Sequence, residues 1–296
     1  MTWTVSIEDE GVLLREFLRE SKQLSRKALA DIKFQGGAIF VNSKEETVRY
    51  VLKSGDKIQL IFPREEVSEW IVPTPLSLDV VFEDEHLLII NKPPHLPTIP
   101  SRNHSELSLA GAVINYYNQC KYPATFHAIN RLDRDTSGLL MIAKHRYIHD
   151  LFSKQQVRQV QRRYQALVHG RLELELGTIN VPIARKPDSI IERVVSENGQ
   201  FAVTHYKVLE RFDDATLVQV SLETGRTHQI RVHFSHIGHP LLGDTLYGGK
   251  SEGIHRQALH SSEIQFFHPI DQHKISFTCP LAKDIEDKLT SMRMDI

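Results

Sequence analysis

The chain has 296 residues, of which 41% are hydrophobic and 25% are charged, a composition that excludes a disordered or fibrous protein. Its length leaves room for two domains, because domains average about 150 residues. The net charge of −1 gives no general attraction to a polyanion, so any nucleic-acid contact must come from local patches. The two cysteines, Cys120 and Cys279, lie far apart in sequence, which favours neither a disulfide framework nor a zinc site.

No apolar run approaches the roughly 20 residues that span a bilayer. The first residues, Met1 to Glu8, lack both the basic head and the apolar core of a signal peptide. We therefore expect a cytoplasmic protein that does not enter a membrane.

The first sixty residues predict two short helices followed by strands. Apolar residues recur at helical spacing over 14–18, and Ser25 can cap a second helix whose apolar face includes Leu29. The runs 38–42 and 58–62 have the composition and alternation of strands. Segments 24–27, 37–42 and 53–58 resemble an S4-like RNA-binding module. That resemblance implies a domain over residues 1–63 in which Arg26 and Lys27, on the second helix, contact RNA phosphates.

Residues 64–75 are first charged and then interrupted by prolines, which is typical of a linker between domains. Over residues 76–296, strand-like runs outnumber helical ones. Because some of their connections are too short for a crossover helix, we expect an α+β fold whose sheet is mixed and largely antiparallel. The predicted strand runs are 80–82, 87–90, 139–143, 164–168, 202–209 and 217–222.

A basic tract lies between residues 144 and 163, where six cations stand against the single acid Asp150. Such a tract is either a solvated helix face or a track for phosphates, and charge alone favours neither. Its cations are Lys144, Arg146, Lys154, Arg158, Arg162 and Arg163.

Asp133 lies in the polar, turn-like segment 131–137, which leads directly into the apolar strand 139–143. A carboxylate on a short loop that is attached to a rigid sheet is well placed for catalysis. The spacing of Asp133, Asp135 and Ser137 also begins like a calcium loop, but that pattern requires a glutamate at the twelfth position, which here is Lys144. We therefore exclude the calcium loop.

The segment 222–233 predicts a strand, a tight turn at Gly225 and then a helix capped by Thr227. Arg226 would lie at the N-terminus of that helix. Its guanidinium and the helix dipole would together attract a partner carboxylate, although a plain surface arginine fits the same spacing.

Two further motifs do not support other activities. The helix carries His228, His233, His236 and His239, but only His233 and His236 share a face and no acidic or cysteine ligand is interleaved, so capping or RNA contact is favoured over a metal. The segment 243–251 looks like a phosphate-binding loop but has one residue too many, which excludes nucleotide hydrolysis.

Together these segments resemble the RluA-type family of RNA pseudouridine synthases over the whole chain. The motifs that carry the resemblance follow in order: 83–93, Arg131-Leu132-Asp133, 136–139, 163–168 with Gly170, 224–233, 258–260 and 277–280. The resemblance implies the pseudouridine synthase fold, flanked by helices, and the isomerisation of uridine in structured RNA. One departure is Asn130, where the family more often has histidine.

The resemblance also implies site residues. Asp133 is the carboxylate that attacks or deprotonates the target nucleoside, and Arg226 pairs with it. Tyr164 stacks on the uracil and Ile230 helps to form the pocket wall. Arg131 holds the flipped base or occupies its vacated place. The basic tract, with Arg163, then becomes an anchor for phosphates.

Isomerisation breaks the C1′–N1 bond and forms a C1′–C5 bond without net redox change, so we expect no cofactor and no metal. A carboxylate can act as a nucleophile or as a base, and both routes stay open. The expected partner is ribosomal or transfer RNA, with no nucleotide cofactor, and we expect a monomer. The alternative is an RNA-binding protein of the same fold that has lost catalysis.

Overall fold

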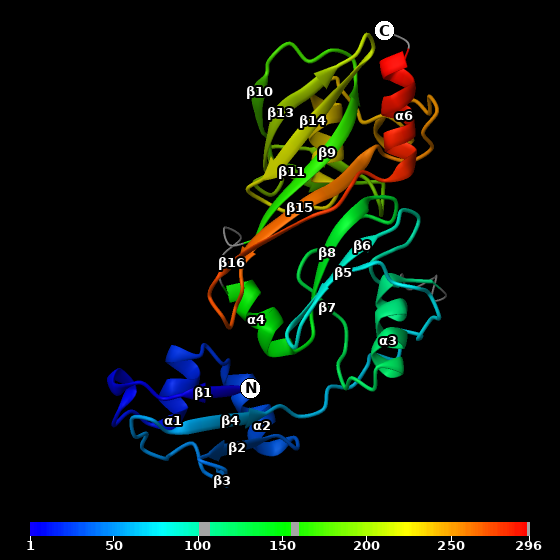
Figure 1. Cartoon of the computed structure of the whole chain (residues 1–296). Helices are drawn as coiled ribbons and strands as arrows, with labels where there is room; N and C mark the ends of the chain where they lie inside the picture. The colour runs from blue at the N-terminus through cyan, green and yellow to red at the C-terminus, as the bar shows by residue number, and fades with distance from the viewer. Residues whose placement is uncertain (101–106, 155–159, 295–296) are drawn as a thin grey trace.

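The computed structural model describes residues 1–100, 107–154 and 160–294. A small four-stranded sheet at the N-terminus is followed by a much larger ten-stranded sheet and a two-stranded ribbon. Figure 1 shows the small N-terminal unit, in blue, at one end of the molecule and the C-terminal helix, in red, at the other. Among the described residues, none of the helices has the length and apolar character needed to cross a membrane.

The N-terminal unit has the predicted helices followed by strands, but a short strand that was not predicted, at Thr2–Thr4, precedes the helices. Ser25 caps the second helix, since its hydroxyl accepts a hydrogen bond from the Ala28 amide at 3.0 Å. Leu29 and Ile32 are buried against the sheet, whose strand order is β1-β4-β2-β3. The elements are β1 (Thr2–Thr4), a 3-10 turn (Ile7–Asp9), α1 (Leu14–Glu16), a π-helical turn (Phe17–Ser21), α2 (Arg26–Phe34), β2 (Ala38–Val41), β3 (Lys44–Glu45) and β4 (Lys57–Ile61).

The N-terminal unit contacts α4 (Arg146–Lys154), mainly through Tyr147. The Tyr147 hydroxyl donates to the Lys22 carbonyl at 2.6 Å, and its ring stacks on Phe62 with centroids 5.6 Å apart. The predicted linker contains no helix or strand, but it is anchored. Glu65 accepts hydrogen bonds from the His127 ring at 2.5 Å and from the Arg146 amide at 2.9 Å. The segment therefore follows the surface of the larger unit.

The large sheet is mixed and largely antiparallel, as predicted. Among the described strands, only β8 and β15 run parallel to each other. The order is β10-β13-β14-β9-β15-β8-β6-β5, and all six predicted strand runs lie in it. Its strands are β5 (Val80–Glu83), β6 (Leu87–Lys92), β7 (His127–Ala128), β8 (Ser137–Ala143), β9 (Gln161–His169), β10 (Leu176–Asn180), β13 (Val203–Arg211), β14 (Ala215–Leu222), β15 (Leu259–Phe267) and β16 (Lys274–Thr278).

Helices cover the large sheet and bury its apolar residues. Figure 1 shows α3 (Leu109–Gln119) beside β5 and β6, and α6 (Lys283–Met294) near the other end of the sheet. Every residue of β8 is buried, which explains why this strand is continuously apolar rather than alternating. The other elements are the ribbon β11 (Ile183–Arg185) and β12 (Arg193–Val195), α5 (Gln229–His236) and a 3-10 turn (Thr245–Tyr247).

The parallel contact between β8 and β15 requires Gly138. Its φ of +106° is unfavourable for other residues, and a Cβ there would lie 2.3 Å from the Ser261 carbonyl oxygen. The glycine thus lets the strand that follows Asp133 approach the centre of the sheet.

His260 on β15 makes stability depend on pH. Burial, and then the charge of Arg256, lower its pKa from the ordinary 6.5 to about 4. Between these values the unfolded chain binds the proton and the folded chain does not, so stability falls as pH decreases. We expect His260 to account for a loss of about 2 kcal/mol between pH 7 and pH 5.

Urea unfolding at both pH values measures this loss. The His260→Asn variant serves as the comparison, because the other histidines are common to both proteins. Its free energy of unfolding should vary less with pH by about that amount. An unchanged pH dependence would show that the pKa of His260 is the same in the folded and the unfolded chain.

Candidate active site

The loop that carries Asp133 is held to the sheet on both sides of that residue. The Thr98 hydroxyl donates to the Leu132 carbonyl at 2.7 Å. The Lys92 ammonium donates to the Arg134 carbonyl at 3.0 Å, and to the carbonyls of Pro93 and Leu96. Three acceptors match the three N–H groups of an ammonium, although burial lowers the pKa of Lys92 to about 7. The position of Asp133 on a short loop fixed to the sheet is therefore as predicted.

Arg231 is the cation that pairs with Asp133. Its Nη1 lies 3.2 Å from Asp133 Oδ2, while Nε and Nη2 form a bidentate pair with Asp244 at 2.7 and 2.8 Å. Burial opposes the charge on Arg231, but hydrogen bonds to Asp244 and the charges of both carboxylates outweigh it and raise its pKa. With 8% of its side chain exposed, Arg231 is held rigidly between the two acids.

The predicted ion pair between Asp133 and Arg226 is wrong. Arg226 Nε donates to the Phe201 carbonyl at 3.0 Å, and its amide donates to the Gln229 side chain at 3.0 Å. The chain makes its turn at His228, whose φ is +58°, so α5 begins at Gln229 and leaves Arg226 outside the helix. The N-cap of α5 is therefore His228 and not the predicted Thr227. The left-handed residue of this turn is also His228, not the predicted Gly225.

A small cavity of about 60 Å³ lies beside Asp133. The residues that the sequence assigned to the site from three distant segments come together there, Arg226 included. Tyr164 on β9 and Ile230 on α5 are almost fully buried in its wall, whereas Arg131 is exposed. Burial raises the pKa of Tyr164, so its phenol is neutral. The lining includes Arg131, Leu132, Asp133, Tyr164, Arg226, His228, Ile230 and Arg231.

A wider cleft of about 590 Å³ shares Asp133 and Tyr164 with the small cavity. Its polar lining is dominated by arginines, and Asp133 is its one acid among the described residues. The Arg162 guanidinium lies within 3.7 Å of the position that a Cβ on Gly225 would take, and its Nε is buried without a hydrogen-bond partner. The arginines of the cleft are Arg131, Arg134, Arg162, Arg193 and Arg226.

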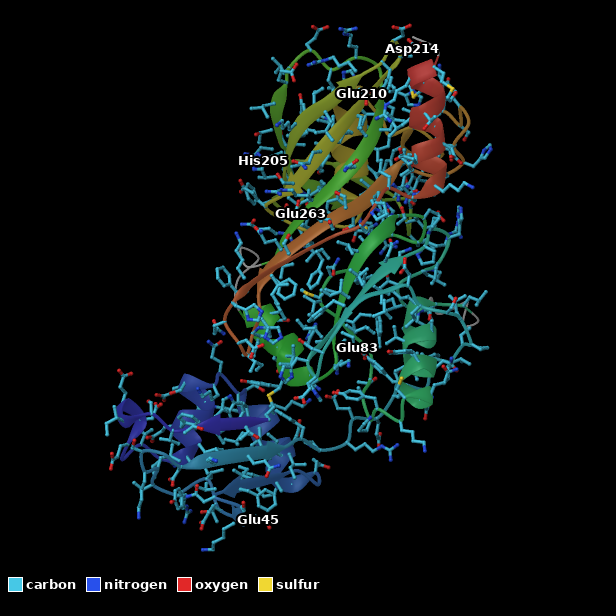
Figure 2. The ribbon with its side chains drawn as sticks, viewed as in Figure 1. Glu45, Glu83, His205, Glu210, Asp214 and Glu263 are labelled. Atoms are coloured by element: carbon cyan, nitrogen blue, oxygen red, sulfur yellow. The ribbon has the colours of Figure 1, made fainter. Side chains whose placement is uncertain are left out.

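The basic tract between residues 144 and 163 is not a continuous track. Lys144 is buried and pairs with Glu83 at 2.6 Å. Arg163 forms two contacts, at 2.8 and 2.9 Å, with Glu263, which Figure 2 shows on β15. The Arg163 side chain does not line the cavities beside Asp133. Sequence charge could not reveal these partners, which come from strands far away in the chain.

Other predicted contacts lie elsewhere or outside the described residues. Arg26 and Lys27 are exposed on α2, as placed, but in the small unit rather than at the cavity. Arg158 and the side chain of Lys154 lie outside the described residues. Asn130 is buried beside the cleft, where its Oδ1 accepts from the Met141 amide at 2.8 Å and its Nδ2 has no partner.

Three residues of the site were not predicted from sequence. Arg231, the partner of Asp133, entered only as part of the segment 222–233. His228 entered only as a possible metal ligand, and Asp244 only as part of an unsuccessful phosphate loop. Of the described residues, none form a cluster of three possible metal ligands. His233 instead binds Thr204 and the Val181 carbonyl, at 2.8 and 3.0 Å. A carboxylate thirteen residues after Arg231 was the available signal for Asp244, but only the fold reveals the pairing.

Solved structures define the class of protein. The human RNA pseudouridylate synthase domain containing 4 is 25% identical, with a TM-score of 0.60, over 72% of this chain and 92% of that one. The human RNA pseudouridylate synthase domain containing 1 has the same fold. Its TM-score is 0.58 at 24% identity, over 74% of this chain and 96% of its own. The fold is that of a pseudouridylate synthase.

Sequence comparison gives the family. The family model for RNA pseudouridylate synthases matches residues 86–236. The RNA pseudouridine synthase YjbO of Bacillus subtilis is 51% identical over 88% of this chain and 93% of its own. The ribosomal large subunit pseudouridine synthase D of Pseudomonas aeruginosa is 36% identical over 88% of this chain and 85% of its own. The chain belongs to the RNA pseudouridylate synthase family, an isomerase family, which confirms the resemblance seen in the sequence.

Proposed function

We propose that this enzyme converts specific uridines of ribosomal RNA to pseudouridine, with Asp133 as the catalytic carboxylate. The observation that carries the assignment is the position of Asp133. Arg231 donates a hydrogen bond to Asp133 Oδ2, and Asp133 and Tyr164 together line both the small cavity and the arginine-lined cleft. Several relatives, such as the Pseudomonas aeruginosa protein, are named for the ribosomal large subunit, which supports ribosomal RNA as the substrate. Transfer RNA is the second candidate.

The chemistry needs one well-placed carboxylate. The reaction breaks the C1′–N1 bond, turns the uracil and joins C1′ to C5; N1 gains a proton and C5 loses one, so no electrons are exchanged. Asp133 Oδ1 forms no hydrogen bond with any described residue, which leaves it free to act. It can add as a nucleophile or remove a sugar proton so that elimination frees the uracil.

The target base must leave its stack to reach Asp133. Extrusion costs a few kcal/mol, which stacking on an aromatic ring and contacts with arginine can offset. Tyr164 provides the ring and Ile230 an apolar wall, while Arg131 at the cavity mouth can hold the flipped nucleotide or fill the space it vacates. The small cavity accommodates little more than the reacting edge of the base, so neighbouring nucleotides would occupy the wider cleft.

Arg162 in the cleft is the cation best placed for RNA phosphate. Replacing Arg162 by Gln should weaken binding to RNA and reduce the slope of log K against log salt by about 1, as expected for one lost phosphate contact. Fluorescence anisotropy between about 50 and 200 mM salt measures both quantities. Arg163→Gln is the matched control, because Glu263 already pairs with Arg163. Equal effects of the two changes would contradict the assignment.

We further propose that residues 1–63 form an S4-like RNA-binding domain, joined by 64–75 to a catalytic domain over 76–296. The separate four-stranded sheet and the exposed Arg26 and Lys27 on α2 support this division. We expect a cytoplasmic monomer that needs no nucleotide cofactor.

Tritium release tests the proposed function, because isomerisation frees the hydrogen at C5 of uridine. Unmodified large-subunit ribosomal RNA, small-subunit ribosomal RNA and transfer RNA, each labelled at C5, should be incubated separately with the protein. We expect release from the large-subunit RNA. Release from transfer RNA alone would mean that transfer RNA is the substrate. Tight binding without release from any of the three RNAs would favour an RNA-binding protein that has lost catalysis. Carbodiimide-dependent primer-extension stops then locate the modified uridine.

A further inference from the structure

We propose that His228 is a positioning residue for Asp133: its imidazole, oriented by Tyr247, presents a proton on Nε2 to the oxygen that Arg231 holds and so directs the other oxygen toward the substrate. This inference rests on the proposed function. His228 Nε2 lies 3.8 Å from Asp133 Oδ2. That separation is too long for a hydrogen bond, but such contacts often shorten when substrate closes a site.

The other ring nitrogen of His228 is fixed by Tyr247. Nδ1 lies 2.7 Å from the Tyr247 hydroxyl, and the two rings meet edge to face with centroids 5.6 Å apart. The Arg231 guanidinium packs over the same tyrosine ring, 4.9 Å from its centroid. His228, Tyr247 and Arg231 thus form one packed group behind Asp133.

The hydrogen bonds of Tyr247 determine where the imidazole proton lies. The Arg193 amide donates to the Tyr247 oxygen at 2.9 Å, and that oxygen is then best used as a donor toward His228 Nδ1. Burial lowers the pKa of His228, so the neutral ring predominates near pH 7. A neutral ring that accepts at Nδ1 carries its proton on Nε2, the nitrogen that faces Asp133.

The backbone of His228 indicates a role other than helix capping. Its φ of +58° is uncommon for a residue with a side chain, and conformations of this kind concentrate at functional sites. His228 stands at the N-cap of α5, yet its side chain forms no capping hydrogen bond. The imidazole is instead used for the contact with Tyr247 and the approach to Asp133.

The surroundings of His228 also allow a chemical test. The side chain lines the small cavity beside Tyr164 and, on its other side, a cavity of about 500 Å³ bounded by Asp244 and Arg256. A left-handed backbone suits glycine and asparagine, so both replacements relieve strain rather than add it. His228→Gly therefore leaves a space that dissolved imidazole can enter.

The experiment measures kcat and KM by tritium release from the RNA that the wild-type protein modifies. We expect His228→Gly to lower kcat by about 10- to 100-fold, the cost of a misplaced catalytic group, with KM changed by less than about threefold. Added imidazole should restore at least part of kcat. His228→Asn keeps the left-handed backbone but leaves no space that imidazole can enter. Its kcat should fall and should not recover when imidazole is added. Imidazole should not rescue Asp133→Asn.

Several outcomes would overturn the proposal. One is a kcat for His228→Gly within twofold of wild type. Another is a lost kcat that imidazole does not restore, together with a lower melting temperature or a raised KM, because this would make the role of His228 structural. If wild-type protein releases no tritium from any RNA, the proposed function fails instead, and the two failures are thereby distinguished.

Discussion

Asp133→Asn is expected to reduce tritium release from ribosomal RNA by at least about a thousandfold, because an amide can act neither as the nucleophile nor as the base. The replacement is close to isosteric. With 26% of the Asp133 side chain exposed and Asp244 still paired with Arg231, the fold should be retained. Binding of RNA should also persist, since the arginines of the cleft are untouched. Single-turnover release and anisotropy measure the two properties separately.

Asp135→Asn is the matched control for that experiment. Asp135 lies two residues away on the same loop and accepts hydrogen bonds from His95 and Arg134 at 2.9 and 3.2 Å, but it does not line the small cavity. We expect Asp135→Asn to keep its rate within tenfold of wild type, since it removes no group from that cavity. If Asp133→Asn were the more active of the two, a different carboxylate would have to be sought.

Much of the fold could be predicted because its signals are local. The buried strand 139–143 is a continuous apolar run, and β4 alternates buried and exposed residues, so each carries its own pattern. The capping hydroxyl of Ser25 is equally local. The order of strands in the large sheet is not local. β15 lies between β9 and β8, although β15 follows both of these strands by about a hundred residues in sequence.

The candidate site was predicted only in part, for the same reason. Asp133, Tyr164 and Ile230 could be placed by motif, and they do line one cavity. The choice between Arg226 and Arg231 depended on where α5 begins, and the left-handed His228 shifts that start by one residue, about a quarter of a helical turn, relative to a cap at Thr227. Motif spacing contains no information about such a turn. The partners of Lys144 and Arg163 were equally out of reach.

Arg231 and Arg226 should differ sharply when each is replaced by glutamine. Arg231→Gln removes the partner of Asp133, so we expect kcat to fall by at least about a hundredfold, as for the loss of a preorganised charge in an active site. It also leaves Asp244, whose side chain is 1% exposed, without its cation, which should cost about 3–5 kcal/mol of stability. Arg226→Gln should keep kcat within about tenfold and mainly raise KM, because Arg226 contacts the cleft and not Asp133.

A second replacement separates catalysis from stability in Arg231→Gln. In the double variant with Asp244→Asn, no buried charge is left unpaired, so the free energy of unfolding should recover much of its loss, while kcat stays low because Asp133 still lacks its partner. Urea unfolding and tritium release measure these quantities on the same preparations. Recovery of kcat together with stability would mean that Arg231 serves only the fold. A loss of kcat in Arg226→Gln as large as in Arg231→Gln would mean that Arg226 reaches Asp133 once RNA is bound.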